Sequence, residues 1–178
     1  MEKVIYSKCS SLDMKKVALN IYSEKFGQGG LIPAKYTCDG KNINPPLEIE
    51  NLPPQTKSLV VVLEDKTWEG NEAVKWLAYN IPAKSWIDED ERKGELGINR
   101  HNQQCYSGPC PEKGLHHYLF KVYAMDDYLY FSQPHVSRCD VEDGIRYHLL
   151  GYGELEGIYD REAKLELMRL PLDQEADN

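Results

Sequence analysis

The sequence predicts a mainly β fold in which antiparallel strands dominate and helices are few. At least six short segments have the composition or the alternation of strands, whereas only one segment has a firm helical pattern. There is no regular alternation of strands with helices, which would have indicated a parallel sheet. The 178 residues are enough for one domain with a single sizeable core.

The first half of the domain contains four predicted strands, which cover residues 19–22, 30–37, 47–50 and 58–63. Pro33 places the second of these at an edge or in irregular structure, because proline cannot donate to a ladder. Leucine and isoleucine alternate with glutamate in the third, as in a half-buried strand. The fourth, SLVVVL, is the most apolar stretch and predicts a central strand that is buried on both faces.

The second half adds three strands over residues 74–82, 118–125 and 152–159, and a helix over 141–150 that Gly151 ends. In VKWLAYNIP, residues 74–82, the alternation places Val74, Trp76 and Ala78 on one face. Lys75 then lies on the other face. A lysine in mid-strand most often covers apolar surface with its stem and keeps its amine in water, but an amine facing a cavity would supply a cation for an anionic ligand.

The domain boundaries follow from this pattern. Residues 1–18 are lysine-rich and weakly patterned, which predicts an N-terminal extension. Residues 19–170 form the predicted domain, and residues 171–178 are expected to fray after Pro171. The segment from 160 to 168 fits a short helix and a strand about equally well. A connection of about 24 residues before Tyr106 shows little periodicity, and long loops of this kind are often functional.

Composition and charge exclude several classes of protein. The net charge of −8 opposes nonspecific attraction to nucleic acid or to an anionic membrane. No apolar run approaches the roughly 20 residues that cross a bilayer, and no signal peptide is evident, so a cytoplasmic location is expected. The five cysteines form an odd and scattered set that favours reduced thiols, and the pattern does not exclude one or two disulfides. They are Cys9, Cys38, Cys105, Cys110 and Cys139.

The stretch YSGPCPEKGLHHYLFKVYA, residues 106–124, combines a loop, titratable side chains and a strand. Glycine and proline fix the loop, which includes Gly108 and Pro109. In a strand, His116 and Tyr118 share one face, whereas His117 points to the other. Asp65 ends an apolar strand, where a carboxylate reaches either solvent or the rim of a cavity. These residues are the candidate site, with a hydrogen-bonded core as the alternative interpretation.

Two chemical alternatives rest on the cysteines. Cys110 near His116 allows a nucleophilic thiolate, and Cys105, Cys110, His116 and His117 allow a zinc site. No active-site signature surrounds Cys110, and the adjacent histidines would point to opposite faces. No phosphate loop, GxGxxG or GxSxG motif is present either. We therefore expect no catalytic reaction, no metal and no cofactor.

The sequence resembles the phosphatidylethanolamine-binding protein family, in its bacterial and archaeal branch of relatives of Raf kinase inhibitor protein. Five blocks in the order of the family carry the resemblance: IPAKYTCDGKNINPPL (32–47), KSLVVVLED (57–65), VKWLAYNIP (74–82), YSGPCPEKGLHHYLFKVYA (106–124) and HLLGYGELEGIY (148–159). The resemblance implies a large antiparallel sheet packed on a smaller one, with one or two short helices. It also implies a small cavity that holds anionic groups, and a binding or regulatory role without catalysis.

The family's motifs assign residues to that cavity. Asp65 matches the first aspartate of Asp-Pro-Asp-x-Pro. Gly108, Pro109, Cys110 and Pro111 match Gly-Pro-x-Pro, and His116 and Tyr118 match Gly-x-His-Arg-Tyr. The implied ligand-binding residues are Asp65, Lys75, Gly108, Pro109, Cys110, His116 and Tyr118.

The sequence also departs from the family. Lys66, Thr67 and Trp68 follow Asp65 in place of proline, aspartate and proline. Lys75 replaces a cavity histidine, and His117 replaces an arginine. Two hypotheses follow: a noncatalytic protein that binds a small anion or phosphorylated ligand, or a regulatory module whose partner is another protein and whose cavity is vestigial.

Overall fold

A computed structural model describes residues 17–162. Their elements are β1 (Val17–Ala18), β2 (Asn20–Tyr22), β3 (Gly30–Leu31), the 3₁₀ helix η1 (Ala34–Tyr36), β4 (Leu47–Glu50), β5 (Ser58–Asp65), the 3₁₀ helix η2 (Gly70–Ala73), β6 (Val74–Pro82), β7 (Trp86–Ile87), β8 (Glu95–Leu96), β9 (His116–Met125), α1 (Arg138–His148) and β10 (Leu149–Tyr159). Within these residues no helix is long and apolar enough to cross a membrane. Most of the predicted extension and the predicted tail lie outside the described residues.

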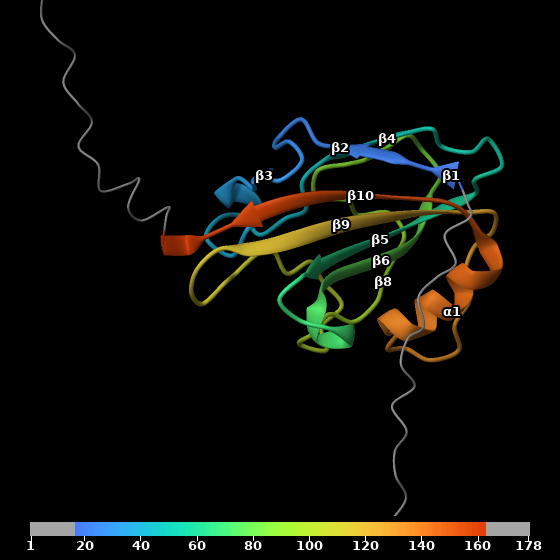
Figure 1. Ribbon diagram of the computed structural model, residues 1–178. Helices are drawn as coiled ribbons and strands as arrows, with labels where there is room; N and C mark the ends of the chain where they lie inside the picture. The colour runs from blue at the N-terminus through green and yellow to red at the C-terminus, as the bar shows by residue number, and fades with distance from the viewer. Residues whose placement is uncertain (1–16, 163–178) are drawn as a thin grey trace, which may run out of the picture.

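Two sheets pack face to face, with α1 against the far face of the larger one (Figure 1). The large sheet has the order β1-β10-β9-β5-β6-β8, with β3 also paired to β10, and the small sheet has the order β2-β4-β7. The long strands pair antiparallel, whereas the short strands β1 and β3 run parallel to β10. The mainly β prediction and the two-sheet arrangement are both confirmed.

Strand β5 separates two hydrophobic clusters, which confirms the prediction of a strand that is buried on both faces. Leu59, Val61 and Leu63 pack between the two sheets. Val60 and Val62 point the other way and pack in the cluster that contains the apolar side chains of α1. All eight residues of β5 are buried, so the hydrophobic effect acts on both of its faces.

Three element predictions need correction. The segment 30–37 was expected to be extended, but it forms the two-residue β3 and then turns into η1. The helix begins at Arg138 rather than at 141, because Ser137 and Asp140 form a capping box. It ends at His148, and β10 begins directly at Leu149, without the predicted glycine stop.

The predicted faces of β6 are also corrected. Leu63 pairs with Trp76, but Glu64 pairs with Val74, so Lys75 is the extra residue of a β-bulge. Val74 therefore packs with Leu77 in the cluster on the helix side, rather than with Trp76. A strict alternation of side chains fails at a bulge because two residues on one strand face one residue on the other.

A buried ionic network ties the large sheet to α1. The Glu64 carboxylate, at the end of β5, lies 2.6 Å from the Lys121 amine and 2.9 Å from the Arg138 guanidinium. Arg138 also contacts Glu142 within the helix, at 2.8 Å. Both glutamates are buried, so the cationic partners offset the cost of removing these carboxylates from water.

Candidate functional site

Three of the predicted site residues meet where β5 and β9 lie side by side. Asp65 pairs across the strands with Tyr118. His116 precedes Tyr118 by two residues on the same strand, and the two rings stack with centroids 6.3 Å apart. Asp65 and Tyr118 are buried, at 4% and 0% exposure. We refer to Asp65, Lys75, His116 and Tyr118 as the Asp65 site.

The Asp65 carboxylate is held as an anion by two donors. His116 Nδ1 lies 2.9 Å from Oδ2, and the Thr67 backbone N–H donates to Oδ1 at 2.9 Å. Burial alone would raise the pKa of Asp65, but these hydrogen bonds outweigh it and hold the pKa below its usual value. The charge of Asp65 is thus already engaged by neighbouring groups.

The contact with Asp65 orients the His116 ring. A hydrogen bond from His116 to the Asp65 carboxylate requires that Nδ1 carries the proton. The same nitrogen lies 3.2 Å from Thr67 Oγ1. No hydrogen bond of Nε2 to another described residue is present. His116 therefore presents Nε2 for an outside group.

The Tyr118 hydroxyl is buried without a hydrogen-bond partner among the described residues. Burial, followed by the nearby negative charge of Asp65, raises the pKa of Tyr118, and the neighbouring Cys110 backbone N–H partly offsets this. The hydroxyl lies near both the Asp65 carboxylate and the Cys110 N–H, but neither contact has the geometry of a hydrogen bond. A hydroxyl that stays protonated is a hydrogen-bond donor. Tyr118 therefore offers a donor inside the Asp65 site.

Lys75 is buried to 5% exposure and sits in the β-bulge of β6. Its amine makes no hydrogen bond or ion pair with any residue in the range 17–162. Burial lowers the pKa of Lys75 and Arg100 lowers it further, while the Asp65 carboxylate acts in the opposite direction. The β-bulge lies beside the end of β5, because Val74 pairs with Glu64, the residue before Asp65.

The loop at 108–111 contributes less than the family motif implies. The Gly108 N–H donates to Asn42 Oδ1 at 2.8 Å, and a Cβ at this position would lie 2.3 Å from the Tyr36 carbonyl oxygen. Pro109 has no N–H, and its carbonyl accepts from the Cys38 N–H. Gly108 and Pro109 therefore shape the loop, and Cys110 retains the N–H that faces the site.

The expectation of reduced thiols is wrong. Cys38 and Cys110 form a disulfide with a Cα–Cα distance of 5.4 Å, and Cys139 is also disulfide-bonded. Among the described cysteines, Cys105 is free, and it is exposed. The disulfide leaves Cys110 without a thiolate, which removes both the nucleophile and the zinc alternatives.

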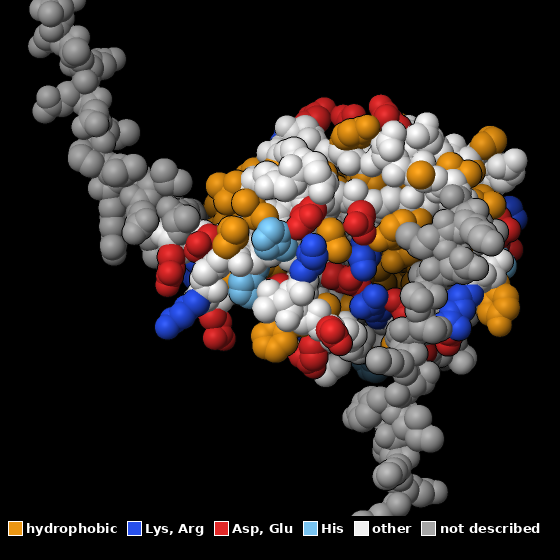
Figure 2. Space-filling view, viewed as in Figure 1, with side chains coloured by type: hydrophobic (Ala, Val, Ile, Leu, Met, Phe, Trp, Pro, Cys, Tyr) orange, Lys and Arg blue, Asp and Glu red, His pale blue; other side chains and the backbone are white. Residues whose placement is uncertain are grey.

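His117 points away from the site, as the strand alternation predicted. Its Nδ1 lies 2.6 Å from Glu156 Oε1, and Lys66 reaches the same carboxylate at 3.5 Å. Histidine, basic and acidic side chains lie close together on the surface at this end of the large sheet (Figure 2). A shallow hollow of about 280 Å³ here is lined by Lys66, Thr67, Leu115, His117 and Glu156. A larger hollow of about 520 Å³ lies over the small sheet, away from the Asp65 site.

Arg100 and Thr67 were not among the predicted site residues. The Arg100 N–H donates to the Val74 carbonyl at 2.8 Å, which places Arg100 beside the β-bulge. Its guanidinium lies 4.8 Å from the centre of the Trp68 ring. The long connection before Tyr106 was the available signal for Arg100, because it predicted a functional loop without naming a residue. For Thr67 the signal was its place two residues after Asp65.

Comparisons with known proteins agree with this architecture. The phosphatidylethanolamine-binding protein family model matches residues 22–160. The UPF0098 protein PH1269 of Pyrococcus horikoshii is 41% identical over 158 residues, which cover 83% of this chain and 79% of that protein. A second relative, the UPF0098 protein PYRAB11530 of Pyrococcus abyssi, is 39% identical and covers 78% of this chain and 84% of its own length.

Solved structures give the same result. The phosphatidylethanolamine-binding protein homolog CT736 from Chlamydia trachomatis has a TM-score of 0.73 and 30% identity, covering 81% of this chain and 98% of its own. Escherichia coli YbcL has a TM-score of 0.70 and 23% identity, and the match covers 81% of this chain and 99% of YbcL. This likeness concerns the fold alone. The chain belongs to the phosphatidylethanolamine-binding protein family.

Proposed function

We propose that the protein is a noncatalytic binder of a small anion or phosphorylated ligand at the Asp65 site. The observation that carries this proposal is the buried Tyr118 hydroxyl, which makes no hydrogen bond with the described residues, together with Lys75, which is 5% exposed and has no ion pair among them. Buried polar groups in proteins are nearly always hydrogen-bonded, to the protein itself, to water or to a ligand. A ligand that accepts hydrogen bonds would satisfy both groups at once.

The charges around the site favour an acceptor that is negative. Lys75 and Arg100 supply positive charge from neighbouring positions, because the Arg100 N–H donates to the carbonyl of Val74, the residue before Lys75. Hydrogen bonds between charged groups are about twice as strong as those between neutral groups. The carboxylate of Asp65 is occupied by His116 and Thr67, so it opposes an incoming anion less than a free carboxylate would.

Access to the site is open on one side. The His116 side chain is 18% exposed and Thr67 is exposed. A small ligand would enter beside these two residues and reach Tyr118 behind them. The family name refers to a ligand whose head group contains a phosphate, and this donor set suits a phosphate as well as a carboxylate.

A titration with phosphate or acetate tests the proposal, with the histidine side-chain NMR signals as the readout. The His116 signals should move and saturate, because Nε2 faces the ligand. The His117 signals serve as the internal control, since this ring is paired with Glu156 on the opposite face. His116 signals that stay unchanged up to tens of millimolar anion would contradict the proposal.

Matched lysine variants locate the binding charge. Lys75→Met should weaken phosphate binding at least about tenfold, because a buried charge-assisted hydrogen bond contributes about 1.5–3 kcal/mol. Lys66→Met is the control, since Lys66 is an exposed lysine that pairs with Glu156. Equal affinities in the two variants would place the anion outside the Asp65 site.

A second candidate is a regulatory module whose partner is another protein. Trp68 replaces a proline of the family motif and is 47% exposed, with the Arg100 guanidinium 4.8 Å from its ring. Exposed tryptophan and arginine are enriched in protein interfaces. A partner that is captured by the wild type and lost with His116→Ala would connect the Asp65 site to the interaction. A partner that is lost with Trp68→Ala alone would place the interaction at the rim.

A further inference from the structure

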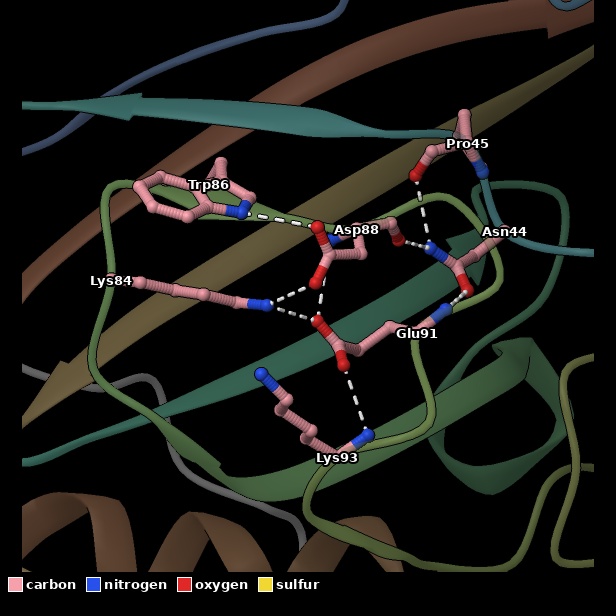
Figure 3. A network of polar contacts seen from close by, with 7 residues as sticks. All are labelled: Asn44, Pro45, Lys84, Trp86, Asp88, Glu91 and Lys93. Atoms are coloured by element: carbon pink, nitrogen blue, oxygen red, sulfur yellow. Dashed lines mark hydrogen bonds and ion pairs between the residues drawn. The ribbon is translucent and has the colours of Figure 1, made fainter.

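Lys75 differs from the other shielded lysines of the described chain. Lys84 lies between two carboxylates, with its amine 2.6 Å from Asp88 and 2.7 Å from Glu91 (Figure 3). Lys121 lies 2.6 Å from the Glu64 carboxylate. The more deeply buried Lys75 has no counter-ion within the distance of an ion pair. Among these three lysines, its amine is therefore the one that no carboxylate pairs with directly.

The surroundings of Lys75 favour a neutral amine. Two causes, burial and the nearby Arg100 charge, lower its pKa. Desolvation and a second cation are the two arrangements that turn a lysine into a nucleophile, because the lone pair of the nitrogen must be free to attack. For comparison, the carboxylates around Lys84 raise the pKa of that amine.

We propose that Lys75 is a nucleophilic amine that forms an imine with a small aldehyde bearing a carboxylate or phosphate group. This inference rests on the proposed anion site, which would hold the charged end of the aldehyde near Tyr118 and His116. The β-bulge brings Lys75 beside the end of β5 that carries Asp65, because Val74 pairs with Glu64.

The reaction is a condensation without an oxidant or a reductant. The Lys75 nitrogen forms a bond to the carbonyl carbon, and the electron pair of the C=O π bond moves to the oxygen. A proton passes from the nitrogen to that oxygen and gives a carbinolamine. Loss of water then forms the C=N bond, so one amine and one aldehyde give one imine and one water molecule.

Reductive trapping tests the inference on the full chain. The protein is incubated with glyoxylate, the smallest carboxylate-bearing aldehyde, and cyanoborohydride, which delivers a hydride to the imine carbon. Peptide mass spectrometry then reports carboxymethylation at each lysine. Lys75 should be trapped faster than Lys84, because a lowered pKa leaves more of the amine neutral, whereas two carboxylates hold Lys84 as an ammonium ion. Equal rates at the two lysines would overturn the inference.

Two further measurements separate this inference from the proposed function. Acetaldehyde, a neutral aldehyde of similar size, should label Lys75 more slowly than glyoxylate, and phosphate should protect Lys75. If phosphate shifts the His116 signals but Lys75 is trapped no faster than Lys84, the imine is refuted and the anion site stands. If Lys75 is trapped rapidly but glyoxylate has no advantage and phosphate gives no protection, the anionic aldehyde class and the anion site are both refuted. Lys75→Arg should lose the fast trapping, because it removes the primary amine, and a carboxymethyl label that persisted elsewhere at the same fast rate would show that another amine had reacted.

Discussion

The disulfide between Cys38 and Cys110 should contribute strongly to stability. It joins residues 72 positions apart, so it removes much of the freedom of the unfolded chain. Loop-closure entropy for a loop of this length corresponds to about 4 kcal/mol at 25 °C. For a domain of this size each kcal/mol shifts Tm by about 2–4 °C, so the double variant Cys38→Ser/Cys110→Ser should melt about 10–15 °C lower.

Chemical denaturation monitored by tryptophan fluorescence measures this difference, with thermal unfolding by circular dichroism as a second readout. Variants are preferable to a reductant, because Cys139 is also disulfide-bonded and would be reduced as well. Cys105→Ser is the matched control, since Cys105 is a free and exposed thiol. If the double variant loses less than about 1 kcal/mol, the entropic reasoning fails for this loop.

Three other substitutions probe the site. Lys75→Met should raise the free energy of unfolding by about 1–3 kcal/mol while it weakens phosphate binding at least about tenfold, because it replaces a buried lysine that has no ion pair, and a loss of stability would contradict this. Asp65→Asn should cost about 1.5–3 kcal/mol at neutral pH. The pKa of Asp65 is lowered in the folded state. The loss of stability should therefore be complete above the pKa of Asp65 in the unfolded chain, and it should disappear as the pH falls through the pKa in the folded protein. A loss that does not change with pH would show that the charge of Asp65 does not contribute. Gly108→Ala should destabilise the fold by about 1–3 kcal/mol in urea unfolding, since its Cβ would meet the Tyr36 carbonyl, and an unchanged midpoint would show that the loop can relax.

The sequence predicted the fold well where the local pattern of apolar and polar residues determines the structure. The valine-rich run of β5 must be buried on both faces, and the alternation of β9 places His116 with Tyr118 and opposite to His117. These patterns depend on neighbours in the sequence, so periodicity reveals them.

Other features depend on residues that are far apart in the chain, and the sequence did not reveal them. The β-bulge at Lys75 comes from the pairing of β6 with β5. The Cys38–Cys110 bond and the position of Arg100 beside Val74 depend on how long loops return to the sheet. Register and loop closure are tertiary properties, and local propensity does not encode them.

The two acids at the end of β5 give the site an unusual mechanical setting. Asp65 faces the proposed ligand site, whereas its neighbour Glu64 is paired on the other side of the sheet with Lys121 and Arg138. Because the two share a peptide unit, a force applied to Asp65 is transmitted through the sheet to α1. The ionic network between the sheet and α1 should therefore influence how rigidly Asp65 is held. Substitutions in α1, which does not contact the proposed site, should then alter the affinity of that site for its ligand.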